Sequence, residues 1–199
     1  MSELCREEVL RYLGYRGQKM DSEFEEKLAR AMALCDRVAR PRYVWGLFDD
    51  PKLQLPNTCG TAVFAATLGQ EISHEIDVWQ RRDMSFAALL DASATQAVEQ
   101  ICDAAEKEIA EWAHTMGLFP ASRVSPGYGD LPLTLQEPIL RLLDAGRRIG
   151  LYLARSLMLA PQKSVTALVS LHAAPQKRAA VRCNLCANVA QCEYRRLPK

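Results

Sequence analysis

The sequence predicts an α+β fold in which helices flank a central, twisted, largely antiparallel sheet. Residues 42–48 are rich in β-forming side chains, and residues 62–69 form an apolar run too short for an ordinary buried helix. Residues 164–171 are followed by a turn at residues 174–176 and by residues 178–182, which predicts an antiparallel hairpin.

The segments before the first strand predict two helices with clear ends. Residues 2–13 place apolar side chains on one helical face, and Gly14 ends that helix. Asp21 can cap a second helix, which stops at Ala39 because Pro41 cannot continue it.

The apolar run at residues 62–69 predicts a central strand covered on both faces. A helix over residues 71–82 follows it, which raises the question of a nucleotide-binding strand-to-helix turn. The glycine-rich G-x-G-x-x-G pattern of such turns is absent at this connection. The sequence therefore argues against a Rossmann methyltransferase.

Residues 83–116 carry the longest helical pattern, and their many alanines allow close packing on a sheet. Asp91, Glu99 and Asp103 on its polar edge could reach a ligand, but spacing alone does not choose among them. Further on, Thr134 and Glu137 form a capping-box pattern that predicts a helix running to about residue 148.

Length and charge limit the possible classes of protein. A chain of 199 residues fits one domain, long enough to bury roughly 70% of the surface its unfolded form exposes. We expect that domain over residues 1–182, with a cysteine-containing tail over residues 183–199. The chain has 25 basic and 24 acidic residues, so no overall field draws in nucleic acid or anionic membrane, and neither is expected as a partner.

The cysteines and the apolar stretches indicate the compartment. No segment approaches 18 uninterrupted apolar residues, and residues 1–8 are charged. We therefore expect a cytoplasmic protein, in which the seven cysteines are reduced thiols or metal ligands rather than disulfides.

Residues 123–130 form a polar stretch with the features of a binding loop. Pro126 and Gly127 suit the second and third positions of a type II turn, since proline presets its φ angle and glycine accepts a positive one. The turn is expected to bring Arg123 and Tyr128 to one side. A guanidinium can take a carboxylate and an aromatic face can hold a cation, which predicts a zwitterionic ligand with a second positive centre.

These residues also carry a family resemblance. Arg-x-x-Pro-Gly-Tyr at 123–128, followed by Gly-Asp-Leu-Pro-Leu, the Ile149-Gly150 helix end and the Pro-x-x-Ser-Val-Thr-Ala stretch at 161–167, resembles the S-adenosylmethionine-binding reactivation domain of cobalamin-dependent methionine synthase. Three separated pieces recur in order, strongly over residues 123–172 and weakly over the preceding helices.

The resemblance implies an activation-domain fold and an accessory role. The chain would bind S-adenosylmethionine and support reductive methylation of cob(II)alamin on a partner, either a cobalamin-binding methionine synthase or another corrinoid protein, with an electron donor. No Asp-x-His-x-x-Gly corrinoid pattern is present, so a partner must supply the cobalamin. The resemblance assigns no catalytic residue here, and whether the chain is an enzyme in its own right stays open.

The resemblance also implies a ligand site. Arg123 would fix the methionine carboxylate, and Tyr128 would line the ligand. Val169 and Ser170 stand where the family has aromatic residues, which favours contacts from the strand backbone instead. The expected ligand-contacting residues are Arg123, Ser125, Pro126, Gly127, Tyr128, Ala167, Val169 and Ser170.

The tail is the second place where chemistry is expected. Cys183 and Cys186 have a C-x-x-C spacing that suits one tetrahedral metal, and Cys192 can add a third thiolate. An iron–sulfur cluster, a zinc ion and free reduced thiols all remain open. The main alternative function is an iron–sulfur redox or scaffold protein of corrinoid metabolism with a vestigial ligand pocket, and a third is an independent methyltransferase.

Overall fold

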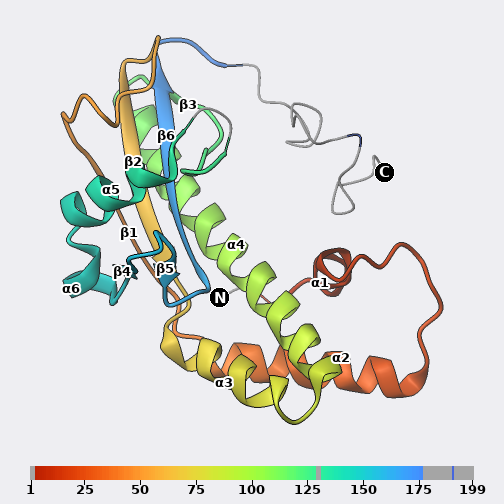
Figure 1. Ribbon diagram of the computed structural model, residues 1–199. Coiled ribbons are helices and arrows are strands. Elements are labelled where there is room, and N and C mark those ends of the chain that lie inside the picture. The colour runs from red at the N-terminus through yellow and green to blue at the C-terminus, as the bar shows by residue number, and fades with distance from the viewer. Residues whose placement is uncertain (1–2, 129–130, 177–189, 191–199) are drawn as a thin grey trace.

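A four-stranded antiparallel sheet forms the centre of the structure, a computed structural model that describes residues 3–128, 131–176 and 190 (Figure 1). The elements, in chain order, are α1 (Arg6–Tyr12), α2 (Ser22–Val38), β1 (Arg42–Leu47), β2 (Gly60–Thr67), α3 (Gln70–Gln80), α4 (Met84–Thr115), β3 (Phe119–Pro120), the 3₁₀ turn η1 (Leu133–Leu135), α5 (Gln136–Leu142), α6 (Ala145–Ile149), β4 (Tyr152–Leu153), β5 (Leu159–Ala160) and β6 (Ser164–His172).

The sheet has the strand order β1-β2-β6-β3, and every neighbouring pair is antiparallel. β2 lies at its centre, paired with β1 from Leu47↔Ala62 to Arg42↔Thr67 and with β6 over its whole length. Its side chains are buried from residue 61 onwards, because helices cover both faces. The apolar run therefore forms a central strand, as its composition predicts.

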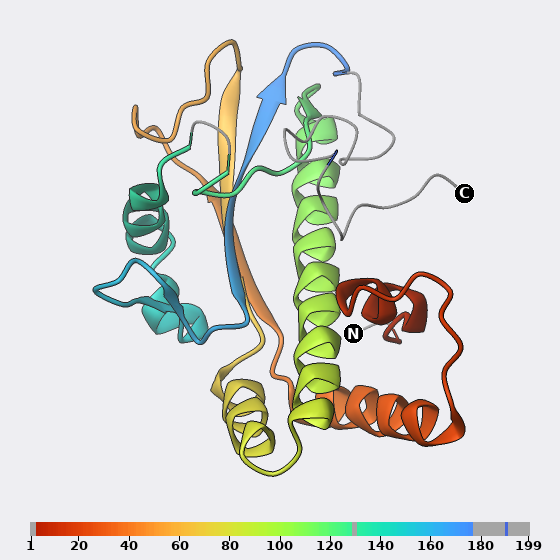
Figure 2. The same ribbon diagram turned by 45° about the vertical axis from the view of Figure 1, so that its right-hand side comes forward.

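The two faces of the sheet carry separate cores. Phe64 on β2 and Val169 on β6 point into the core shared with α1, α2, α3 and α4. Val63 and Leu168 point the other way, against α5 and α6. Figure 2 shows α4 standing along one face of the sheet and α5 with α6 on the other. Phe64 is fully buried, and burial of such a side chain stabilises the fold by roughly 1.5–3 kcal/mol.

The long helix α4 is capped at its start and buried along one side. The Asp83 carboxylate accepts a hydrogen bond from the backbone N–H of Phe86 at 3.1 Å, which satisfies one of the first unpaired donors of the helix. Near its other end, Trp112 packs against Trp45 of β1 with ring centroids 5.8 Å apart. α4 thus spans the face of the sheet and can position side chains along its length.

Most predicted elements are confirmed. The strands at 42–48, 62–69 and 164–171 correspond to β1, β2 and β6, and the helices predicted from Asp21 and over residues 83–116 correspond to α2 and α4. The α+β fold is confirmed, and the antiparallel sheet agrees with the argument against a Rossmann domain.

Two predicted helices have different limits. The first helix begins at Arg6 rather than at residue 2. The capping box at Thr134 does not form, because Thr134 lies inside the 3₁₀ turn and Leu135 precedes α5 without a side-chain cap. Asp144 then adopts a left-handed conformation (φ 50°, ψ 41°), which interrupts the helical hydrogen bonds and separates α5 from α6.

Two further predictions fall outside the described residues. The hairpin strand expected at 178–182 is one of them, and the boundary of the cysteine tail at 183 is the other. Within the described part, β6 pairs with β2 on one side and with β3 and Val124 on the other. Among the described residues, none of the helices combines the length and apolar character that crossing a bilayer requires.

Candidate functional site

The stretch that resembles a ligand-binding signature folds into the predicted type II turn. The carbonyl of Ser125 accepts a hydrogen bond from the N–H of Tyr128 at 3.2 Å, and Gly127 has φ +91°. That angle favours glycine. A Cβ at Gly127 would also lie 3.2 Å from the Cδ1 atom of Leu133, so the turn is packed against η1.

The chain entering the turn is fixed to the edge of the sheet. Val124 and Leu168 exchange two backbone hydrogen bonds of 2.9 and 2.8 Å, and Ala121 donates to the carbonyl of Ser170 at 2.9 Å. These bonds extend the β3 side of the sheet along β6. They hold the turn at a defined position next to α4.

Arg123 is directed into α4 rather than toward solvent. Its Nη2 atom lies 2.5 Å from the Oε2 atom of Glu99, and its Nη1 atom lies 2.7 Å from the Oδ1 atom of Asp103. Nη1 also pairs with Glu106, which accepts a 2.8 Å hydrogen bond from the Arg123 backbone N–H as well. The Arg123 side chain is 6% exposed, whereas Tyr128 is 75% exposed. The two residues flank the turn, and only Tyr128 faces solvent.

The surroundings of Arg123 act on its pKa in opposite directions. Burial alone lowers the pKa of the guanidinium, but Glu106, Asp103 and Glu99 raise it, so the net change is upward and the charge is secure. Beneath the cluster, burial raises the pKa of the Cys102 thiol to about 12, with Arg123 opposing that rise and the carboxylates adding to it. Cys102 is therefore an uncharged thiol at neutral pH.

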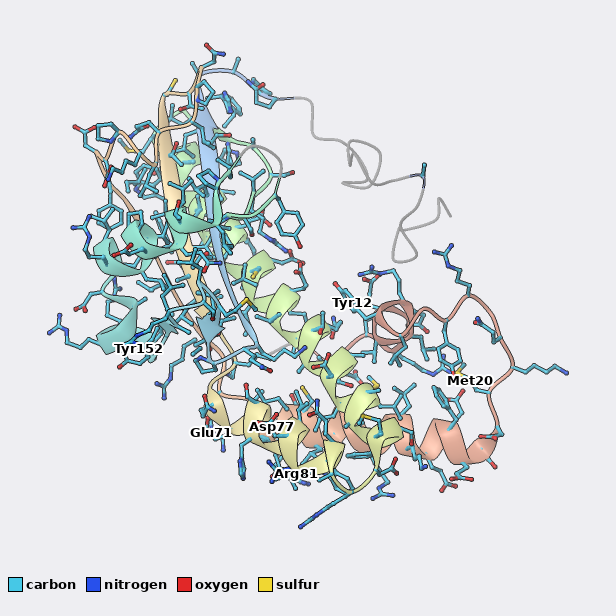
Figure 3. The ribbon with its side chains drawn as sticks, in the orientation of Figure 1. Tyr12, Met20, Glu71, Asp77, Arg81 and Tyr152 are labelled. Atoms are coloured by element: carbon cyan, nitrogen blue, oxygen red, sulfur yellow. The ribbon has the colours of Figure 1, made fainter. Side chains whose placement is uncertain are left out.

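The cluster carries an excess of negative charge. Three carboxylates surround one guanidinium, and two of the three are partly open: the side chains of Glu99 and Asp103 are 42% and 68% exposed, against 14% for Glu106. The negative charge also acts on Tyr12 of α1 (Figure 3). The pKa of Tyr12 is raised, mainly by burial and secondly by the charge of Glu99. A site with this balance favours a ligand that carries positive charge.

No protein-family model matches the chain, and no curated protein matches it. A crystal structure of the MetH reactivation domain bound to AdoHcy superposes with a TM-score of 0.61 over 88% of this chain and 79% of that one, at 16% sequence identity. The chain has the fold of the MetH reactivation domain. The resemblance stated from the sequence is confirmed at the level of the fold.

Within the MetH reactivation fold, the expected site residues separate into two groups. Arg123, Ser125, Pro126, Gly127 and Tyr128 share one turn. The side chains of the expected β6 residues are placed elsewhere: Ala167 and Val169 are 0% and 1% exposed in the core under α4, and the Ser170 hydroxyl shares a 3.0 Å hydrogen bond with Nε2 of His172. In this arrangement β6 holds the turn through its backbone.

The acidic partners of Arg123 were only partly visible in the sequence. Glu99, Asp103 and Glu106 follow the spacing i, i+4, i+7, which places all three on one face of a helix. That spacing is the signal that could have added Glu106 to the candidates. Asp91, the other candidate on α4, instead pairs with Lys163 at 2.8 Å and ties the start of β6 to the helix.

Three cavities in the described part of the chain have volumes of about 370, 550 and 670 Å³, and the residues that line them belong to segments other than the turn. Tyr128 supplies the exposed ring for a ligand at the turn to lie against.

The predicted metal ligands Cys183, Cys186 and Cys192 lie outside the described residues. Within residues 3–128 and 131–176, no group of three or more metal-binding side chains comes together. Among the thiols of the described residues, Cys59 is exposed and Cys102 is buried.

Proposed function

We propose that this chain binds S-adenosylmethionine at the turn formed by residues 123–128 and presents its methyl group to a cobalamin carried by a partner corrinoid protein. The reaction would be the reductive methylation of cob(II)alamin. The proposal is supported by one coincidence: the fold is that of a domain crystallised with AdoHcy, and the Arg-x-x-Pro-Gly-Tyr stretch within it forms a rigid turn beside an acidic helix face.

The charges at the turn fit this ligand. S-adenosylmethionine carries a sulfonium, an ammonium and one carboxylate, so its net charge is positive and complements a cluster with two excess carboxylates. For Arg123 to take the ligand carboxylate, one of its present partners must give way. Asp103 is the most exposed of them, and once released it can accept the ammonium group of the ligand.

The chain would act by binding and orientation. Glu106 keeps its bond to the Arg123 backbone and holds the guanidinium in place, while Tyr128 packs against the ligand from the solvent side. In the proposed reaction an electron donor would reduce the partner's cob(II)alamin by one electron, the methyl–sulfur bond would break as the methyl group moves to cobalt, and S-adenosylhomocysteine would leave. Holding the donor in one orientation is then the main contribution of this chain, as an accessory subunit.

The partner would have to approach the turn directly. Val124 and Tyr128 are 41% and 75% exposed, so this face of the turn is open to a partner. A corrinoid protein such as cobalamin-dependent methionine synthase, docked on this face, would cover the ligand and exclude water from the transferring methyl group.

The tail adds a separate element to the proposal. Cys183, Cys186 and Cys192 would hold an iron–sulfur cluster or a zinc ion, and a cluster there would relate the chain to the electron supply. Iron, sulfide and zinc measured on protein purified without oxygen test this. Iron, sulfide and zinc each below about one equivalent per ten chains would contradict a metal site in the tail.

A scaffold function is the second candidate, because one observation favours it. Arg123 is already paired with three carboxylates and almost wholly buried, as expected of an arginine that fixes a loop to a helix. In that case the turn joins β3 to α5 and takes no ligand.

Calorimetric titration distinguishes the two functions. We expect S-adenosylmethionine to bind the native chain, and Tyr128→Ala to weaken binding about three- to tenfold through loss of the exposed ring. Tyr152→Ala is the matched control, since Tyr152 is 61% exposed on β4 and belongs to a different cavity. Absence of binding at about 1 mM ligand supports the scaffold.

A further inference from the structure

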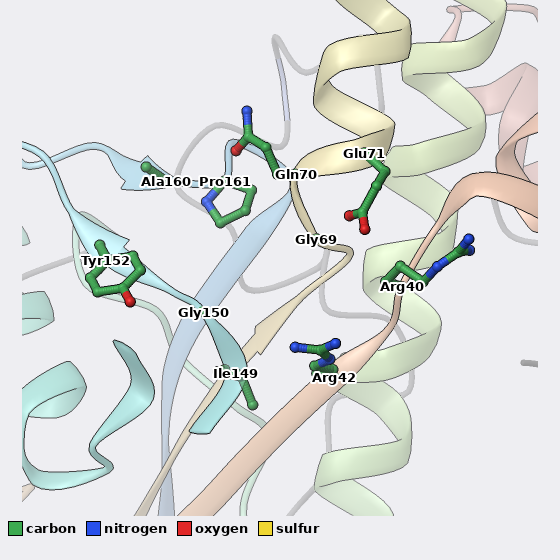
Figure 4. A pocket seen from close by; sticks show the side chains of 10 residues that line it. All are labelled: Arg40, Arg42, Gly69, Gln70, Glu71, Ile149, Gly150, Tyr152, Ala160 and Pro161. Atoms are coloured by element: carbon green, nitrogen blue, oxygen red, sulfur yellow. The ribbon is translucent and has the colours of Figure 1, made fainter. Parts of the chain in front are cut away.

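A second candidate site lies at the end of the sheet where β1 begins and β2 ends. A cavity of about 370 Å³ opens there, within the size range of small-molecule sites. Its walls come from three parts of the chain: the α2–β1 connection, the β2–α3 turn, and the segment from the end of α6 to β5 (Figure 4). Ile149-Gly150 and Pro161, two of the pieces that resemble the family, line this cavity rather than the turn at residues 123–128.

Arg42 supplies a guanidinium that is free in the described structure. Its backbone pairs with Thr67 at the end of the sheet, but its side chain makes no hydrogen bond or ion pair with any of the described residues. Figure 4 shows this guanidinium between the Gly69 turn and Ile149, on the wall of the cavity. An unpaired guanidinium can take a carboxylate or a phosphate through two hydrogen bonds.

Tyr152 forms the opposite wall of the cavity, and its ring packs against Gly146 of α6. A Cβ at Gly146 would lie 2.7 Å from the Cε1 atom of Tyr152, so only glycine lets the ring rest against α6. Despite this contact, Tyr152 is 61% exposed. With Ile149 and Pro161 nearby, it offers an apolar surface for the body of a ligand.

The other charged side chains at the cavity leave a positive balance. Arg40 donates to the carbonyls of Arg37, Val38 and Ala39 at the end of α2, and Figure 4 shows its guanidinium pointing away from Tyr152. Glu71 contributes the one carboxylate on the wall and opposes an anion. Two arginines and one glutamate thus line the cavity, and Arg42 is the arginine whose guanidinium is available to a ligand.

We propose that this cavity binds a small organic anion whose phosphate or carboxylate head pairs with Arg42 and whose planar body lies against Tyr152. The site is separate from the turn at residues 123–128 and does not depend on the function proposed for that turn. It assigns the chain a second ligand of opposite charge preference.

Nuclear magnetic resonance titration of the full chain tests this site. The probes are phenyl phosphate and phenylacetate, with phenol as a neutral analogue. We expect at least one anion to bind with a Kd of about 1 mM or lower and at least tenfold more tightly than phenol. Its affinity should fall as the salt concentration rises. The better of the two anions identifies the head group.

Variants locate the binding. Arg42→Ala should lower the affinity for the better-binding anion at least tenfold. Arg81 is an exposed arginine at the far end of α3 (Figure 3), and Arg81→Ala should leave that affinity within twofold of the native value. Glu71→Gln should strengthen it about twofold by removing a like charge. No anion binding at about 10 mM, equal affinity for phenol, or an Arg42→Ala variant that binds as tightly as the native chain overturns the proposal.

Discussion

Arg123 and Arg42 use the same side chain in opposite ways. Arg123 is 6% exposed and paired with three carboxylates of α4, while Arg42 is exposed and unpaired among the described residues. A buried guanidinium is retained only with partners, because desolvation of its charge is costly. An exposed one costs little, so it can remain available for a ligand. Burial therefore separates an arginine that must release a partner before it can take a ligand carboxylate from one that is available to an anion at once.

The largest difference is expected in stability. Arg123→Ala leaves Glu106 mostly buried without its cation, and we expect the free energy of unfolding to fall by about 3 kcal/mol. Arg42→Ala should change it by less than about 0.5 kcal/mol, since nothing in the described structure depends on its charge. Urea unfolding of both variants measures the contrast, and equal losses would contradict the distinction between them.

A backbone substitution tests whether the turn is as rigid as its packing indicates. Gly127→Ala places a side chain at φ +91° and against Leu133, and it should cost about 1–2 kcal/mol of stability and weaken S-adenosylmethionine binding. Gly17→Ala is the control, because Gly17 has φ +92° but nothing within 4 Å of the added Cβ. We expect Gly17→Ala to lose stability through backbone strain alone and to bind the ligand as the native chain does.

Among the carboxylates, the expected losses of stability are graded by exposure, and that of Asp103 should be small. Glu106→Gln should cost about 1–2 kcal/mol, because Glu106 is 14% exposed and holds both the backbone and the side chain of Arg123. Asp103→Asn should cost less than about 0.5 kcal/mol, as for an exposed ion pair. Thermal unfolding at low and high salt checks the grading, and an Asp103 effect as large as that of Glu106 would show that exposure is a poor guide here.

Some elements of the fold could be predicted from the sequence and others could not. The central strand β2 was predictable because an apolar run of its length has few alternatives, and the type II turn was predictable because Pro126 and Gly127 have strong backbone preferences. The division between α5 and α6 was not, since it depends on the left-handed conformation of Asp144, which no local pattern required.

The candidate site shows the same limit. The sequence located the turn, but it placed Arg123 on the ligand side with Tyr128, whereas the structure pairs it with α4. Contacts between residues twenty positions apart depend on how β6 and α4 are packed. The free guanidinium of Arg42 was hidden for the same reason, because its cavity is assembled from three distant segments.

A crystal structure of the chain with S-adenosylmethionine at saturating concentration tests the central claim most directly. We predict the ligand against Tyr128, with its carboxylate on Arg123 and with Asp103 moved from the guanidinium to the ligand ammonium. A turn that stays empty, with all three carboxylates still on Arg123, would contradict the account. So would the ligand found only in the cavity beside Arg42.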